Sequence, residues 1–228
     1  EFFNYKTATE FKKLDIYNCE FYGAVSSGTV MKGFYYINVG ATIEAINIQN
    51  SFIHDIVCDG GDLFDCRKGY IKSLNINNNV IYNCATERDF IRYDDASNSF
   101  GNPIPEINIT QNTIDNCMNG TNGKRILYVR FNGKKGGQRI TVANNLITNT
   151  KAVYTNQATT STPEYRNNYY FNCNNANIFA ASDKDNSLYW NGDVSGKNGD
   201  NPNYQNTAKG QFTVMNKDIS KLKVGAQR

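Results

Sequence analysis

Residues 71–84, IKSLNINNNVIYNC, carry the pattern that decides the fold. Leu74, Ile76 and Ile81 are its apolar positions, and Asn78 and Asn83 each follow an apolar run. The apolar residues alternate with polar ones at a period of two, which is typical of a strand and not of a helix. The pattern therefore predicts a strand, a corner at Asn78, a short second strand and another corner at Asn83.

The same pattern recurs along the whole chain. Residues equivalent to Asn78 are Asn18, Asn50, Gln111, Asn144 and Asn167, and successive copies are 23 to 33 residues apart. Between the copies lie strand-like runs at 29–37, 62–69, 88–95, 126–133 and 151–158. Self-similarity at this period indicates a solenoid. We predict an all-β parallel β-helix of about six visible turns, with corner asparagines stacked into a ladder.

A leucine-rich repeat is the main alternative, because it shares the apolar and asparagine spacing. Three features count against it. Most steps exceed the 20–29 residues of that repeat, the apolar residues are mainly Ile, Val, Tyr and Phe, and no helical pattern follows any copy.

Composition narrows the function classes. The chain has 228 residues and a formal net charge of +3, which is too mild to indicate a nucleic-acid or membrane partner. It has no apolar run long enough to span a membrane. Cys84, Cys117 and Cys173 occupy one position of the repeat, which predicts a column of small buried side chains rather than a zinc site. We expect a monomer with coils at 1–181 and a loop-rich segment at 182–228 that caps the last turn. The opening residues read as if already inside a turn, so we expect further coils before them.

Charged residues recur in the strand-like runs between the copies. Aligning these runs by their apolar residues turns six side chains inward: Phe64, Cys66, Ile91, Tyr93, Val129 and Phe131. It predicts two outward columns, one of Lys32, Asp65, Arg92, Arg130 and Thr155, the other of Phe34, Arg67, Asp94, Asn132 and Gln157. Arginine grips carboxylate or sulfate in two bonds. The strip therefore predicts a groove for an acidic polysaccharide, with aromatic rings for sugar faces at Tyr70, Phe90, Tyr128 and Trp190. An ordinary charged face with arginine and aspartate paired across strands is the alternative.

Other chemistry is less favoured by the sequence. His54 is the only histidine and sits near a corner, where a surface role is the more common one. Asp65 and Asp94 are the candidate carboxylates for a glycosidase. We expect neighbouring arginines to lower their pKa values, which would spoil a general-acid role.

The repeats resemble the pectate-lyase-like right-handed β-helix superfamily over nearly the whole chain. The tail is similar to the end of such proteins from Bacteroidetes, through Pro202 and Tyr204, Gly210 and Phe212, and Gly225 and Arg228. The resemblance implies a right-handed helix that is exported to the extracellular or outer-membrane surface as part of a polysaccharide-utilisation system. A lipid anchor on a preceding segment is one way in which such a protein attaches.

Residues 62–69 and 88–95 also resemble the chondroitinase B and alginate lyase branch. That resemblance implies that Arg67 stands at the position of the base, with Lys68 beside it. It implies as well that Arg92 neutralises the carboxylate of the substrate. It also implies Ca²⁺ held by acids, here Asp59, Asp62 and Asp65, although Gly60 stands where another acid is expected.

Three functions remain open from the sequence. We expect an exported, non-catalytic protein that binds acidic polysaccharide through Lys32, Arg67, Arg92 and Arg130. The alternatives are a polysaccharide lyase acting by β-elimination, with or without Ca²⁺, and a purely structural stalk. No cofactor other than Ca²⁺ is indicated.

Overall fold

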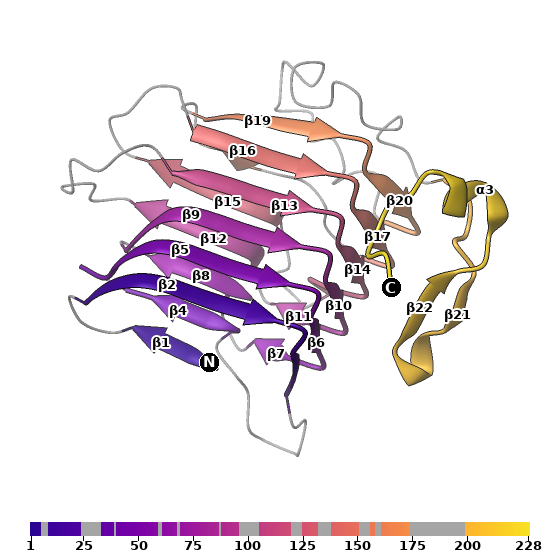
Figure 1. The fold of residues 1–228 in the computed structure, drawn as a ribbon, viewed down its shortest axis with the longest axis horizontal. Helices are drawn as coiled ribbons and strands as arrows, with labels where there is room; N and C mark the ends of the chain where they lie inside the picture. The colour runs from indigo at the N-terminus through magenta and orange to yellow at the C-terminus, as the bar shows by residue number, and fades with distance from the viewer. Residues whose placement is uncertain are drawn as a thin grey trace.

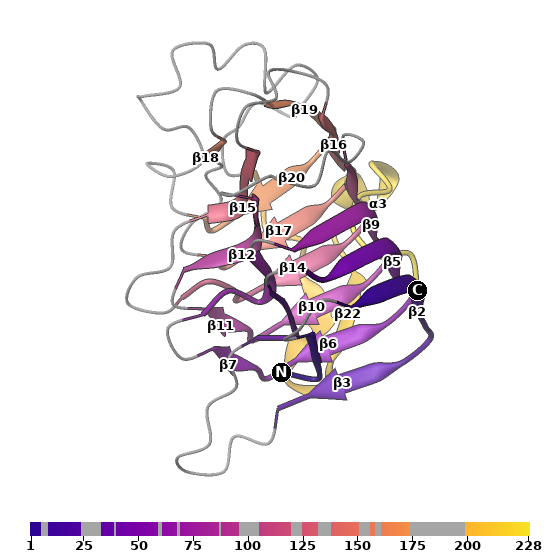
Figure 2. The ribbon, with the colours of Figure 1, turned by 90° about the vertical axis from the view of Figure 1, so that its left-hand side faces the viewer.

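Three parallel sheets of six strands each form the body of the protein in the computed structural model (Figures 1 and 2). The structure describes residues 1–5, 9–23, 33–38, 40–58, 61–67, 69–86, 88–95, 105–119, 125–131, 138–150, 156–157, 161–173 and 199–228. Each sheet contributes one strand to each rung of the solenoid, and every pairing inside these three sheets is parallel. The prediction of a parallel β-solenoid is therefore confirmed.

The strands of each sheet follow one another along the axis. Sheet A contains β1 (Phe3–Tyr5), β4 (Tyr35–Ile37), β8 (Phe64–Arg67), β12 (Asp89–Asp95), β15 (Arg125–Phe131) and β18 (Asn156–Gln157). Sheet B contains β2 (Glu10–Tyr17), β5 (Thr42–Gln49), β9 (Tyr70–Asn77), β13 (Glu106–Thr110), β16 (Gln138–Ala143) and β19 (Ser161–Arg166). Sheet C contains β3 (Glu20–Tyr22), β6 (Phe52–His54), β10 (Val80–Tyr82), β14 (Thr113–Asp115), β17 (Leu146–Thr148) and β20 (Tyr169–Phe171). A small sheet pairs β7 (Val57–Cys58) with β11 (Ala85–Thr86).

The corners are made by asparagine in the left-handed conformation. Asn78, between sheets B and C, has φ of 54°, and its equivalent Gln111 has φ of 60°. Asn83, after sheet C, has φ of 52°. Asparagine adopts this conformation more readily than other residues with a Cβ, so a repeated Asn fixes both turns. The prediction of corners at these positions is confirmed.

The principal asparagine ladder lies one residue beyond the first corner. Its four members are fully buried, and each of the first three donates a hydrogen bond to the next in the series: Asn79, Asn112, Asn145 and Asn168. The Nδ2 of Asn112, for example, donates to Asn145 Oδ1 at 3.1 Å and to the Ile76 carbonyl at 2.8 Å. The corner asparagines form shorter ladders of their own, such as Asn78 to Asn50 at 2.7 Å.

The core is a column of isoleucines and other apolar residues from all three sheets. Ile76, Ile81 and Ile91 are fully buried on their respective sheets of neighbouring rungs. Burying each such side chain contributes about 1.5–3 kcal/mol. Cys84, Cys117 and Cys173 are buried free thiols, as predicted, and the Sγ of Cys84 lies 3.4 Å from the Tyr82 carbonyl oxygen.

The C-terminal unit lies along the flank of the solenoid, beside sheet C (Figure 1). It consists of β21 (Tyr204–Asn206), the 3-10 turn η1 (Thr207–Lys209), β22 (Gln211–Val214) and α3 (Lys217–Lys221). Phe212 packs on Val80 and Tyr82, and Ile219 packs with Leu146 and Tyr169. We predicted that this tail caps the last turn. Its described part instead covers the outer face of sheet C, because that face carries apolar side chains that need burial.

The final residues, 223–228, continue along the corner between sheets B and C, and we call them the strap. Gln111 Nε2 donates to the Gly225 carbonyl at 2.8 Å, and Gln227 N–H donates to Asn78 Oδ1 at 2.7 Å. The strap therefore runs back from the fifth rung toward the second. None of the helices in the described part of the chain has the length and hydropathy of a membrane span.

Candidate functional site

Sheet A brings together four of the predicted site residues, on rungs three and four. Arg92 of β12 is the register partner of Asp65 of β8, and Asp94 is the partner of Arg67. The four predicted inward residues that the structure describes, Phe64, Cys66, Ile91 and Tyr93, are fully buried. The sequence therefore predicted correctly which side chains of β8 and β12 point into the core.

The register with the outer rungs differs from the prediction. Asp65 pairs with Tyr36 of β4, not with Lys32, and Arg92 pairs with Tyr128 of β15, not with Arg130. Arg130 is instead the partner of Asp94. These are shifts of four and two residues, which leave the period-two pattern unchanged and so could not be detected from it.

Asp62 is the centre of this cluster. Its side chain is fully buried, and its Oδ2 lies 3.0 Å from Arg67 Nη2 and 3.8 Å from Arg92 Nη1. Its Oδ1 accepts the Asp89 backbone N–H at 2.8 Å. Arg67 Nε also binds Asp65 Oδ2 at 2.8 Å. The two arginine side chains keep 29% and 19% of their surface exposed, so their guanidinium groups are anchored from below and reach the surface.

Burial raises the pKa of Asp65 to about 7, and the negative charge of Asp62 adds to the shift, while Arg67 and Arg92 oppose it. We expected the neighbouring arginines to lower this pKa. The arginines do lower it, but desolvation of a carboxyl that is 2% exposed outweighs them, so the net shift of the Asp65 pKa is upward.

Arg67 is poorly suited to act as a base. Its guanidinium is engaged by two carboxylates, those of Asp62 and Asp65, and arginine keeps its proton in proteins. In the part of the chain that the structure describes, no three acidic, cysteine or histidine side chains converge as metal ligands. Asp62 and Asp65 both form ion pairs with Arg67.

Several predicted residues cannot be placed with their side chains. Six of them lie outside the described residues: Lys32, Asp59, Lys68, Asn132, Thr155 and Trp190. For Asp94, Tyr128 and Arg130 only the backbone is described, in β12 and β15.

Three aromatic residues predicted to face outward are buried. Tyr70 is 5% exposed, and Phe90 and Phe34 are fully buried. Phe34 packs within a ring cluster, 5.1 Å from Phe21 and 5.5 Å from Phe64 between centroids. None of the three can offer a ring face to a sugar.

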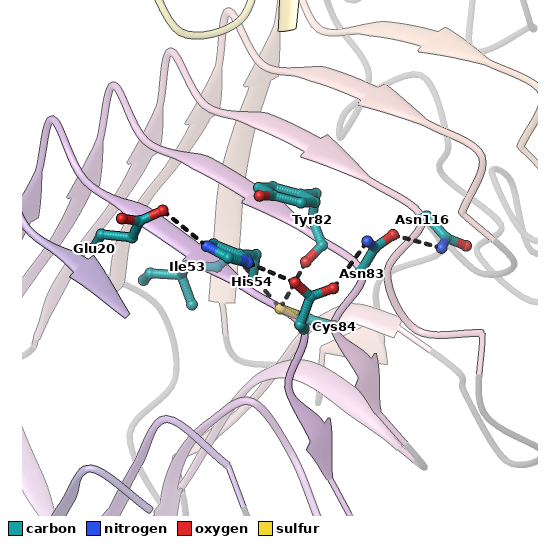
Figure 3. A network of polar contacts seen from close by, with 8 residues as sticks. Glu20, Ile53, His54, Tyr82, Asn83, Cys84 and Asn116 are labelled. Atoms are coloured by element: carbon teal, nitrogen blue, oxygen red, sulfur yellow. Dashed lines mark hydrogen bonds and ion pairs between the residues drawn. The ribbon is translucent and has the colours of Figure 1, made fainter. Parts of the chain in front are cut away.

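The sequence interpretation missed a second polar site, on sheet C around His54 (Figure 3). His54 is 9% exposed, not a surface residue, and it is stacked between Tyr22 and Tyr82 at 5.5 and 4.6 Å. Its Nδ1 lies 2.7 Å from Asp55 Oδ2 and its Nε2 lies 3.1 Å from Glu20 Oε1. The aromatic residue that recurs directly before the second corner, at Tyr22 and Tyr82, was the available signal.

A hollow of about 520 Å³ lies beside this network, at the corner between sheets B and C. Its lining comes from the first three rungs and from the end of the strap: Asn18, Cys19, Glu20, Asn50, Phe52, Asn78, Gln227 and Arg228. The guanidinium of Arg228 lies over the Phe52 ring, 4.5 Å from its centroid. Burial lowers the pKa of Arg228.

Together, the three sheets and their ladders define a parallel β-solenoid protein with asparagine ladders and two polar sites. The chain belongs to the family described as domain of unknown function DUF5123, which matches residues 107–228. A second such description, domain of unknown function DUF4957, matches residues 3–84. No curated protein and no solved structure matches the chain.

Proposed function

We propose that this protein is an exported, right-handed solenoid of the pectate-lyase-like kind that binds an acidic polysaccharide on sheet A without cleaving it. The observation that carries the proposal is the pair of anchored guanidinium groups, Arg67 and Arg92, on neighbouring rungs. Both have a buried carboxylate beneath them and a solvent-exposed portion above.

Anchoring by Asp62 and Asp65 supports binding for an energetic reason. A free arginine loses side-chain entropy when it grips a ligand, whereas these two are already ordered by the pairs beneath them. The Arg67 guanidinium has five N–H donors, more than its contacts with Asp62 and Asp65 use. The remaining donors suit the planar carboxylate of a uronic acid or a sulfate ester.

The length of the site follows from the register. Arg67 and Arg130 are both register partners of Asp94. They are therefore two rungs, or about 10 Å, apart along the axis. A linear polysaccharide lying along the axis would meet cationic positions on three successive rungs. The same surface does not favour a lyase, since the Arg67 guanidinium already contacts Asp62 and Asp65 and arginine is a poor general base.

Gel electrophoresis with embedded glycan tests the proposal. Native protein is run through gels containing pectate, alginate, chondroitin sulfate or neutral dextran. We expect retardation by at least one acidic glycan and none by dextran. Ultraviolet absorbance of the same mixtures, with and without Ca²⁺, reports any unsaturated product. A rise in absorbance would replace binding with β-elimination, and normal migration in all three acidic gels would refute the proposal.

The matched variants are Arg92→Lys and Lys72→Gln. Arg92→Lys keeps the charge next to Asp62 but removes the planar fork, so we expect weaker retardation. Lys72 is exposed on β9 of sheet B, so Lys72→Gln removes a positive charge away from the site. We expect it to migrate like the native protein in acidic gels after correction for its mobility in dextran.

A further inference from the structure

The strap occupies only part of the corner between sheets B and C. Its backbone is bound rung by rung: Gly225 N–H donates to the Asn144 carbonyl at 2.8 Å, and Ala226 N–H donates to Thr113 Oγ1 at 3.0 Å. Gln227 N–H then meets Asn78 on the third rung. The corner thus already binds a segment of polypeptide main chain through side-chain and backbone groups of successive rungs.

The hollow of about 520 Å³ continues this corner past the strap. It extends to Asn50 and Asn18, the corner residues of the second and first rungs. Asn50 Oδ1 accepts a hydrogen bond from Asn78 Nδ2, but its own Nδ2 has no partner among the described residues. The Asn18 amide likewise has none in the part of the chain that the structure describes. The volume lies within the range of ligand sites.

Glu20 gives the hollow a fixed negative charge. His54 Nε2 lies 3.1 Å from the Glu20 Oε1 (Figure 3). His54 is itself held by Asp55 and stacked between the rings of Tyr22 and Tyr82. Each ring nitrogen of His54 thus faces a carboxylate oxygen, which fixes the position of the Glu20 side chain. Glu20 keeps acceptor capacity beyond this bond, and its side chain is 59% exposed.

Arg228 gives the opposite side of the hollow a positive charge. Its guanidinium lies over Phe52, which is the one aromatic ring in the described lining. That ring is therefore not open for a sugar to stack on. Glu20 and Arg228 form no ion pair with each other among the described residues. The hollow thus carries separate charges of both signs and unused amides.

We propose that this hollow binds an extended peptide segment of a partner protein, with a basic side chain at Glu20 and an acidic side chain at Arg228. The main chain of the peptide bonds to the Asn18 and Asn50 amides, as the strap bonds to Asn78 and Gln111. Main-chain bonds supply affinity in such complexes, and the flanking charges supply specificity. This site is separate from the polysaccharide site on sheet A and does not depend on it.

Isothermal titration with a defined peptide tests the proposal. The probe is an acetylated, amidated hexapeptide with a lysine and a glutamate two residues apart, which share one side in an extended chain. The reference peptide carries glutamine at both positions. We expect native protein to bind the probe about tenfold more tightly than the reference, a difference of about 1.4 kcal/mol.

Matched variants identify the site. Glu20→Gln can still accept from His54 Nε2, so the network survives while the charge is lost. We expect this variant to bind both peptides equally, whereas Glu44→Gln, the same change at an exposed position of β5, keeps the preference. The proposal would be overturned if native protein bound the probe and the reference peptide equally, or if Glu20→Gln kept the full preference for the probe. Displacement of the probe by an acidic oligosaccharide would also overturn it. Arg92→Lys separates the two sites, because it weakens polysaccharide binding and leaves peptide binding unchanged.

Discussion

Arg67 Nη2 lies 3.0 Å from Asp62 Oδ2, and it joins a partly exposed cation to a carboxylate with no exposed surface. The contact binds the end of β8 to the loop residue that precedes it. Because Asp62 also accepts the Asp89 backbone N–H, the same carboxylate ties the third rung to the fourth. Arg67 is therefore a structural residue as well as a candidate binding residue.

We predict that Arg67→Met destabilises the fold by about 3–5 kcal/mol, because two buried carboxylates lose their principal cation. Urea unfolding followed by circular dichroism measures the change. Lys72→Met, an exposed control on sheet B, should change stability by less than about 0.5 kcal/mol. Adding Asp62→Asn and Asp65→Asn to Arg67→Met should recover part of the loss. If Arg67→Met and Lys72→Met have the same free energy of unfolding, the buried ion pairs contribute nothing to stability.

Asp65 makes stability depend on pH in a defined direction. Its pKa is about 7 in the folded protein against an ordinary value of 3.8, so the folded state binds this proton more tightly. The resulting stabilisation is complete below about pH 4 and is lost as pH rises through about 7. In Asp65→Asn this dependence should be absent. The difference in unfolding free energy between native protein and the variant, measured from pH 4 to 8, tests it. A flat difference would contradict the raised pKa.

Asn112→Ala should cost about 3 kcal/mol. The change removes bonds to the Asn79 backbone N–H and to the Ile76 carbonyl, and both groups remain buried. Asn172→Gly is the matched control at an exposed corner, where one ladder bond to Asn149 is lost and φ of 50° suits glycine. Thermal unfolding of both variants gives the comparison. Similar losses would mean that the buried ladder has no special weight.

Gly225→Ala should release the strap. Gly225 has φ of +79°, and a Cβ there would lie 2.7 Å from Thr113 Oγ1 and 2.9 Å from Leu146 Cβ. Hydrogen exchange at Ala226 and Gln227 should become faster, while exchange in β9 stays slow. Lys221→Ala, at an exposed position in α3, serves as the control. Unchanged protection at Ala226 would show that the corner tolerates the methyl group.

The repeated pattern predicts the strands, both corners and the buried cysteine column, because each depends on residues within a single rung. Asn78 is the clearest case, since a short amide that tolerates positive φ is needed at that one position. The register of sheet A could not be predicted, because shifts of two or four residues preserve the alternation. Tyr36 rather than Lys32 therefore lies beside Asp65.

Long-range contacts account for the rest. His54 is stacked between Tyr22 and Tyr82, which lie on the rungs before and after it. Gln227 meets Asn78 across 149 residues of sequence. Both contacts join different rungs, so the polar site around His54 and the hollow beside it were not predicted.

The most direct test of the polysaccharide proposal is titration of the acidic glycan that retards the native protein, at low and at physiological salt. We predict measurable binding that weakens with salt. We also predict an affinity about tenfold lower in Arg92→Lys and unchanged in the sheet B control Lys72→Gln. Equal affinities in native protein and in a folded Arg92→Lys would contradict binding on sheet A. Absence of binding to every acidic glycan would favour a structural stalk instead.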